Sequence, residues 1–165
     1  MNDDAASRQA ITDVIHRYCR SMDRIDAELG YGVWHEGGTA DYGPVFQGTG
    51  RGFIDWVCEF HRTLDSHHHQ VGNILIDLRG NEAGSETYIT VNLLAKEEAD
   101  GKRTIRTGRG RYLDRWSRRD GRWAIDHRHF ILDFVVTHGV DVVTGWSHRD
   151  SNDPSYGVLA AQGAA

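Results

Sequence analysis

Apolar residues recur at helical spacing in two segments within the first 64 residues of the chain. Over residues 7–23 they fall three or four positions apart, which predicts an amphipathic helix with the apolar face Ile11, Val14, Ile15, Tyr18 and Met22. A second helix is predicted over residues 52–64, where the apolar stripe is Phe53, Trp56, Val57 and Phe60. A short helix over residues 27–34 has less support, because Gly30 and Gly32 are poor helix formers.

The middle of the chain changes to the alternation of apolar and polar residues that is typical of β-strands. It predicts strands over residues 69–78, 86–94, 104–116 and 123–136. Turn sequences separate them at residues 79–82, 99–102 and 118–122. Glycines inside strands mark bulges or bends, which we expect at Gly72, Gly108 and Gly110.

Helices followed by a run of antiparallel strands predict an α+β fold, with a curved antiparallel sheet around a cavity that the helices close. No repeat, proline-rich linker or low-complexity segment divides the sequence. We therefore expect a single domain over residues 1–165, with a core at about 7–136 and a polar, glycine-rich tail at 137–165.

Composition narrows the possible partners of this domain. The 165 residues are 39% hydrophobic, which is enough to build a core, and the formal net charge of −5 argues against nucleic acid as a partner. The arginine-rich segment at residues 103–119 alternates with Thr, Gly, Tyr and Trp, and is typical of a strand with a charged outer face.

The N-terminal residues, the length of the apolar runs and the cysteines indicate the cellular location. The polar residues 1–9 do not resemble a signal peptide, and no apolar run is long enough to span a membrane. Cys19 and Cys58 fall on predicted helices and form no CxxC motif, which favours a reducing compartment. We expect a cytoplasmic protein with no membrane partner.

Candidate chemistry lies where the strand starting at His69 meets the end of the first helix. Alternate side chains of a strand share a face, so His69, Val71 and Asn73 are expected to line the same cavity. An imidazole in an apolar cavity is suited to proton transfer. Asp23 lies at the rim of the helix stripe, and its carboxylate would form an Asp–His dyad if it reached His69.

Three sequence segments resemble a known family. They are YCRSMDR at the end of the first helix, WHEGGTADYG after the second, and RYLDRWSRRDGRWAIDHR in the last hairpin. Residues 11–134 resemble a SnoaL-like domain of the nuclear-transport-factor-2-like superfamily, which has the cystatin-like α+β barrel fold, a cone-shaped barrel. Within it the likeness is to the scytalone dehydratase, bile acid 7α-dehydratase and hexachlorocyclohexane dehydrochlorinase families, cofactor-free lyases that use an Asp–His pair in a conical pocket.

The resemblance implies roles for five residues. Asp23 and His69 match the positions of the catalytic pair, and the spacing from His69 to Asn73 matches the dehydrochlorinase. Tyr18 and Tyr42 match pocket tyrosines of the bile acid dehydratase. Each tyrosine could donate a hydrogen bond to a substrate or could be a core residue with a satisfied hydroxyl group. Asn73 could orient a substrate or satisfy a bulged backbone.

Arg128 and a set of aromatic residues complete the candidate pocket. Arg128 shares the strand-face parity of a pocket arginine in the dehydrochlorinase, but a salt bridge to Asp114, Asp126 or Asp133 is an equal alternative. The apolar walls are expected to come from Trp34, Phe53, Trp56, Phe60 and Phe130, although such residues are more often core.

A metal site is the competing interpretation of the histidines. His127 and His129 point the same way on one predicted strand and could chelate zinc or iron. No third ligand follows from the spacing, so we expect neither a metal nor another cofactor.

The candidate residues together with this resemblance predict a cofactor-independent lyase, a dehydratase, that acts on a hydrophobic cyclic or polycyclic small molecule. An isomerase or cyclase could use the same pocket. The alternative from another class is a non-catalytic binding or accessory subunit, in which Asp23 and His69 would lie far apart or side chains would fill the cavity. Aromatic residues on the outer face of the sheet predict a homo-oligomer, and the resemblance implies a trimer or a dimer.

Overall fold

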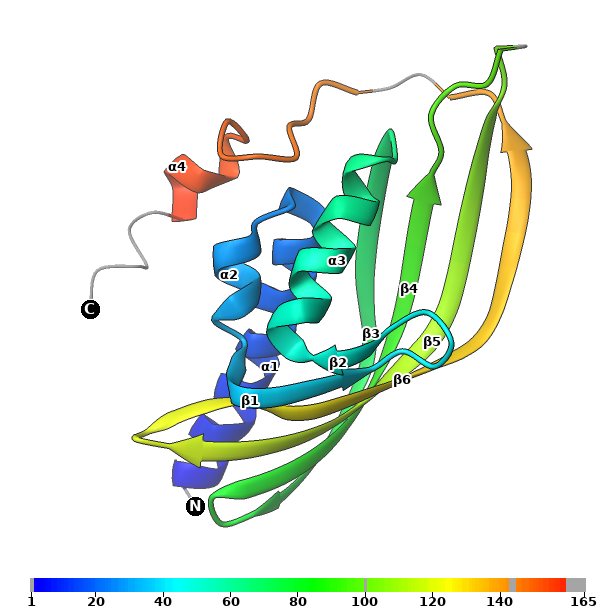
Figure 1. Ribbon diagram of the computed structural model, residues 1–165. Helices are drawn as coiled ribbons and strands as arrows, with labels where there is room; N and C mark the ends of the chain where they lie inside the picture. The colour runs from blue at the N-terminus through cyan, green and yellow to red at the C-terminus, as the bar shows by residue number, and fades with distance from the viewer. Residues whose placement is uncertain (1, 100, 143–144, 160–165) are drawn as a thin grey trace.

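The computed structural model describes residues 2–99, 101–142 and 145–159, and consists of one strongly bent sheet with helices on its concave side (Figure 1). The elements in chain order are α1 (Asn2–Arg24), α2 (Ala27–Tyr31), β1 (Trp34–Asp41), β2 (Gln47–Thr49), α3 (Gly50–Arg62), β3 (Ser66–Arg79), β4 (Glu82–Leu94), β5 (Arg103–Arg119), β6 (Arg122–Val140) and α4 (Ser155–Leu159).

The sheet has six strands in the order β2-β1-β6-β5-β4-β3. β1 runs parallel to β6, whereas every other neighbouring pair is antiparallel. The long strands curl, as twisted strands of this length do, and α1 and α3 lie in the opening between the two edges of the sheet (Figure 1). The predicted α+β class and curved sheet are confirmed. In detail, the sheet is mixed and stays open, with the helices on the unclosed side.

The predicted helices and the four long strands are present, with ends shifted by a few residues. Residues 118–122 form the expected hairpin turn, in which Asp120 and Gly121 have positive φ angles of 51° and 79°. Two strands were not predicted. The short helix ends at Tyr31, and Trp34 begins β1. This glycine-containing segment has no strand pattern of its own, and hydrogen bonds to β6 hold it extended.

A β-bulge in β3 reverses which side chains point inward. The register with β4 shifts between Val71 and Ile74, so the less exposed positions change from odd to even residue numbers along the strand. Asn73 lies in this bulge and is exposed. The expectation that Asn73 shares a face with His69 is therefore wrong, because the extra residue at Gly72 and Asn73 breaks the two-residue alternation.

The other two glycines that were expected to mark bulges, Gly108 and Gly110, differ in their strand pairing. A register shift between β5 and β6 falls at Gly110, as predicted, whereas Gly108 pairs regularly with Val135. A Cβ atom on Gly110 would lie 2.3 Å from the carbonyl oxygen of Ile131, so this close approach requires glycine. A Cβ atom on Gly108 would meet only Leu132, at 3.7 Å, so this glycine leaves space on the inner face of β5.

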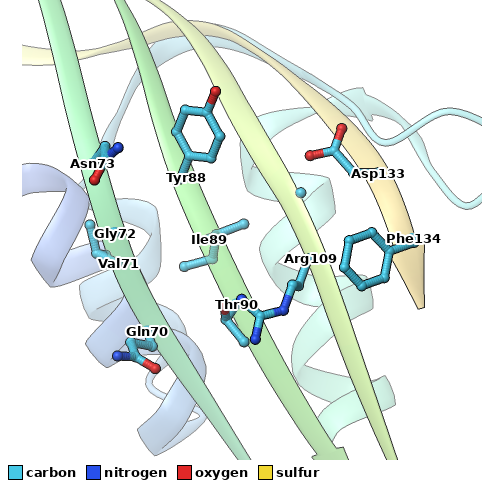
Figure 2. Close-up of a pocket in the computed structure, with 11 residues that line it drawn as sticks. Gln70, Val71, Gly72, Asn73, Tyr88, Ile89, Thr90, Arg109, Asp133 and Phe134 are labelled. Carbon is cyan, nitrogen blue, oxygen red and sulfur yellow. The ribbon is translucent and has the colours of Figure 1, made fainter. Parts of the chain in front are cut away.

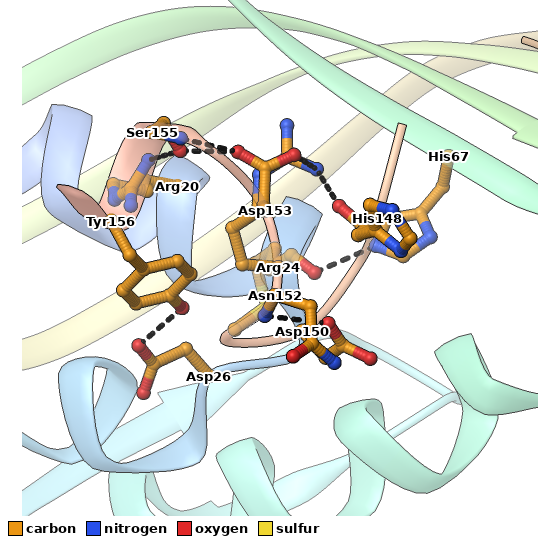
Figure 3. A network of polar contacts seen from close by, with 11 residues as sticks. Arg20, Arg24, Asp26, His67, His148, Asp150, Asn152, Asp153, Ser155 and Tyr156 are labelled. Carbon is orange, nitrogen blue, oxygen red and sulfur yellow. Dashed lines mark hydrogen bonds and ion pairs between the residues drawn. The ribbon is translucent and has the colours of Figure 1, made fainter. Parts of the chain in front are cut away.

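The C-terminal tail returns across the end of α1 (Figure 3). Tyr156 donates a hydrogen bond to Asp26 at 2.7 Å, and Arg24 donates one to the carbonyl oxygen of His148 at 2.7 Å. Arg20 bonds the hydroxyl group of Ser155 at 2.9 Å. The sequence predicted no structure here, yet these contacts fix the tail beside the last turn of α1. Within the described residues, every helix is too short or too polar to cross a membrane.

Candidate active site

Asp23 and His69 are in direct contact. The Nδ1 atom of the His69 ring lies 2.7 Å from Oδ1 of Asp23, and the side chains are 6% and 13% exposed respectively. The backbone N–H group of His69 donates to the same carboxylate, at 3.0 Å and 3.2 Å. One carboxylate therefore holds both the backbone and the ring of His69, which fixes the ring orientation.

The position of Asp23 explains why the carboxylate turns toward β3. Asp23 is the residue before the last of α1, where the negative end of the helix dipole disfavours an anion. The two donors of His69 compensate for this disadvantage. A carboxylate on Nδ1 leaves Nε2 as the ring nitrogen that can take up a proton, and the ring lines a cavity.

That cavity has a volume of about 520 Å³ and lies between the inner face of the sheet and α3. Its size is in the range that small-molecule sites occupy. Strands β4, β5 and β6 supply one wall, and the apolar stripe of α3 supplies the other. The predicted wall residues Phe53, Trp56, Phe60 and Phe130 all line it.

Two tyrosines form the polar part of the lining near Phe130. The hydroxyl groups of Tyr18 and Tyr42 are 2.8 Å apart, and Tyr42 stacks on Phe53 with ring centroids 3.9 Å apart. Burial is the largest cause that raises the pKa of Tyr18 well above its ordinary value, and burial also raises the pKa of Tyr42. Both hydroxyl groups therefore keep their protons, and the one that accepts the mutual hydrogen bond has its own proton left to donate.

Arg128 lies behind this aromatic group and is absent from the cavity lining. Its side chain is fully buried and forms two hydrogen bonds to Asp114, at 2.7 Å and 2.8 Å. The guanidinium group also lies 4.2 Å from the ring centroid of Tyr18 and 3.9 Å from that of Tyr112. Of the two alternatives for Arg128, the structure has the salt bridge to Asp114, so this arginine supports Tyr18 from behind.

Two predicted site residues lie elsewhere. Trp34 is buried, but its ring packs over the start of α3, where a Cβ atom on Gly50 would lie 2.2 Å from the indole. Trp34 is therefore a core residue. The prediction was wrong because β1 was not predicted, so the direction of the Trp34 side chain was unknown. Asn73 lines a separate hollow of about 560 Å³ on the sheet face turned away from the helices, beside Tyr88 and Arg109 (Figure 2).

Two histidines that were not predicted as site residues lie beside the dyad. His61 of α3 and His67 of β3 are buried, with ring centroids 4.0 Å apart, and His61 lines the cavity. Burial lowers the pKa of His61 to about 2 and the pKa of His67 to about 4. Both rings are therefore neutral near pH 7. His61 could have been found from its place one residue after Phe60, at the edge of the apolar stripe.

His67 links three segments of the chain. Its Nε2 atom lies 2.6 Å from the carbonyl oxygen of Met22, and its Nδ1 atom lies 3.0 Å from a guanidinium nitrogen of Arg149. The arginine can only donate, so Nδ1 accepts and the Nε2–H group donates to Met22. This chain of bonds ties the tail to the residue that precedes Asp23.

The histidines proposed as an alternative metal site are engaged otherwise. Nδ1 of His127 bonds the hydroxyl group of Thr39 at 2.8 Å, and Nδ1 of His129 lies 3.0 Å from Asp41. Among the residues that the structure describes, no three His, Cys, Asp or Glu side chains converge as metal ligands.

The fold and this site together define a class: an α+β protein whose sheet and helices enclose an apolar cavity with an Asp–His pair at one wall. Residues 3–129 match the SnoaL-like domain family, and the chain belongs to that family. A comparison with curated protein sequences gives no match.

Solved structures share this fold at low sequence identity. A candidate scytalone dehydratase from Novosphingobium aromaticivorans is 21% identical, with a TM-score of 0.71 over 87% of this chain and 95% of that one. A hexachlorocyclohexane dehydrochlorinase from Novosphingobium barchaimii is 14% identical, with a TM-score of 0.74 over 87% and 98%. A protein of unknown function with a cystatin-like fold from Nostoc punctiforme is 21% identical, with a TM-score of 0.63 over 78% and 92%.

Proposed function

We propose that this protein is a cofactor-independent lyase that removes water from a hydrophobic cyclic or polycyclic small molecule. The contact of 2.7 Å between Asp23 and His69, at the wall of an apolar cavity, carries the proposal. In the proposed reaction, His69 is the proton acceptor that faces the substrate, and the carboxylate of Asp23 lies behind it. The fold shared with a candidate scytalone dehydratase and with a dehydrochlorinase fits an elimination reaction.

The elimination uses groups that the cavity holds. Nε2 of His69 removes a proton from the carbon next to the one that bears the leaving hydroxyl group. The electron pair of that C–H bond forms the C=C bond as the C–O bond breaks. The imidazolium then returns its proton to the departing oxygen, which leaves as water. Asp23 stabilises the imidazolium and holds the ring tautomer.

Tyr18 and Tyr42 assist where negative charge develops. If the abstracted proton lies next to a carbonyl group, an enolate oxygen forms during the reaction. The tyrosine proton that the mutual hydrogen bond leaves free can bond to this oxygen. Positioned donors act strongly in a cavity from which bound substrate excludes water. The same proton abstraction would start an isomerisation, which differs only in where the proton returns.

The alternative of a non-catalytic binding subunit has less support. For such a subunit, Asp23 and His69 were expected to lie far apart, or side chains were expected to fill the cavity. The contact between the two side chains and the cavity of about 520 Å³ both favour the enzyme.

Proton abstraction can be tested before the natural substrate is known. The protein is incubated in D₂O with a panel of cyclic ketones and cyclic hydroxyketones, and exchange next to the carbonyl is followed by proton NMR. His69→Ala should slow exchange by roughly 100-fold or more, since positioned acid–base catalysis contributes about 10²–10⁴-fold. Asp23→Asn should also slow it severely, because an amide cannot stabilise the imidazolium as a carboxylate does.

Matched controls lie beside each residue. His68 is the exposed neighbour of His69, and Asp13 is a partly exposed aspartate on the same helix as Asp23. His68→Ala and Asp13→Asn should keep the exchange rate of the unchanged protein. Folding of all four variants is checked by circular dichroism. If folded His69→Ala and Asp23→Asn exchange as fast as the controls do, the Asp–His mechanism is wrong.

A further inference from the structure

We infer that the cavity takes an amphipathic substrate, an apolar ring system with an anionic group that Arg106 binds at the outer end of the cavity. This inference deepens the proposed function and rests on it, because it concerns the same site. It adds a substrate class and names a residue that selects for it.

The strand register places Arg106 relative to the dyad. One row of paired residues crosses four strands through His69, Val91, Gly108 and Val135. The next row along the strands is His67, Leu93, Arg106 and Thr137. Arg106 and its two neighbours Leu93 and Thr137 all line the cavity. Arg106 is exposed, whereas Tyr112 on the same strand face is buried, so Arg106 marks the open end.

The inner face of β5 changes character along its length. It begins at the buried ring of Tyr112, passes Gly110, where Phe130 and the backbone of Ile131 fill the place of a side chain, and continues through Gly108 to Arg106. A Cβ atom on Gly108 would meet only Leu132, at 3.7 Å. The wall is therefore bare backbone at Gly108, and a flat apolar body can lie against it there, between the aromatic end and the cation.

Arg106 is the one lining residue with a permanent charge among the described residues, and the lining contains no carboxylate. Some of the other arginines of the same strand have acidic partners: Arg103 bonds Glu97 at 3.1 Å, and Arg111 bonds Glu86 at 2.8 Å. Within the described part of the chain, Arg106 has no hydrogen bond or ion pair of this kind. A guanidinium group at the end of an apolar cavity is suited to an anionic group of the ligand.

The register also sets the length of such a ligand. His69 and Arg106 are two strands and two residues apart, which corresponds to roughly 10 Å across the sheet and roughly 7 Å along it. The sheet curls and both side chains extend into the cavity, so the anionic group should lie on the order of 10 Å from the reacting carbon. A molecule of two or three fused rings with an acidic substituent has this length.

The inference is tested with two fluorescent probes that differ in one anionic group, anilinonaphthalene sulfonate and its uncharged parent N-phenylnaphthylamine. Binding of each probe is titrated at low salt in the unchanged protein and in Arg106→Gln. Exposed ion pairs are weak, so we expect Arg106→Gln to weaken sulfonate binding by roughly two- to fivefold. The uncharged probe should bind as before, and added salt should reduce the difference.

Two further variants localise the effect. Arg109 is on the same strand but on the opposite face, beside the outer hollow, so Arg109→Gln should leave both probes unchanged (Figure 2). Gly108→Val adds a side chain inside the cavity and should weaken both probes. The inference is overturned if Arg106→Gln affects both probes equally or neither, if Arg109→Gln has the same effect, or if Gly108→Val changes neither probe. None of these measurements needs turnover, so their failure is distinct from a failure of the lyase proposal.

Discussion

Acidification should destabilise the fold through His61 and His67. Their pKa values in the folded protein are about 2 and about 4, below the ordinary value of 6.5, and burial is the largest cause for both. A histidine with a lowered folded pKa binds a proton more readily when the chain unfolds. Its contribution to stability is therefore complete above about pH 6.5 and is lost as the pH falls toward the folded value.

The magnitude follows from the two pKa values. At pH 5 both rings are protonated in the unfolded chain and almost entirely neutral in the folded one. Each histidine then lowers the free energy of unfolding by about 2 kcal/mol relative to pH 8, and the two together lower it by about 4 kcal/mol. This loss is large beside the total stability of a small protein, about 5–15 kcal/mol.

The assay is urea unfolding followed by tryptophan fluorescence at several pH values between 5 and 8. His61→Phe keeps a ring of similar size against His67 but removes one titrating group. It should reduce the fall in unfolding free energy between pH 8 and pH 5 by about 2 kcal/mol. His68→Gln changes an exposed histidine and should leave the fall as it is. Equal pH dependence in His61→Phe and the unchanged protein would refute the assigned role of burial.

Three other outcomes are expected. Arg128→Met leaves the carboxylate of Asp114 buried without its partner and should lower the free energy of unfolding by about 3–5 kcal/mol, measured in the same urea assay. Exchange or turnover should survive exhaustive chelation, and activity restored only by zinc or iron would contradict the proton-transfer mechanism. We expect a homo-oligomer, a trimer or a dimer, and sedimentation that shows only monomer at micromolar concentration would exclude it.

The elements that could be predicted are those whose own residues show the characteristic spacing or turn sequence. The stripe from Ile11 to Met22 repeats at helical spacing, so it predicted α1 without knowledge of what covers it. The Asp120–Gly121 turn follows from residues that adopt positive φ angles readily. β1 has no such signal, because partners almost 90 residues away in β6 hold it extended. Without β1, the position of Trp34 could not be predicted.

The candidate site was predicted in part, and the failures have a common cause. The contact between Asp23 and His69 was expected because both positions match a known family and each has a definite place on its element. Asn73 was misplaced because one extra residue in a strand reverses every later inward position, and glycine marks such a bulge without fixing its register. Arg149 could not be connected to His67, since that bond depends on the path of a tail with no periodic pattern.

Burial gives the three neighbouring histidines different tasks. His61 and His67 are kept neutral, and a second positive charge beside the dyad is thereby avoided. Both ring nitrogens of His67 form hydrogen bonds, one to Met22 and one to Arg149, and these bonds fix the turn of α1 that carries Asp23. His69 alone among the three bonds a carboxylate and also lines the cavity. In the proposed mechanism, this cluster of three histidines therefore presents a single ring for proton transfer, because desolvation and hydrogen bonding commit the other two to structure.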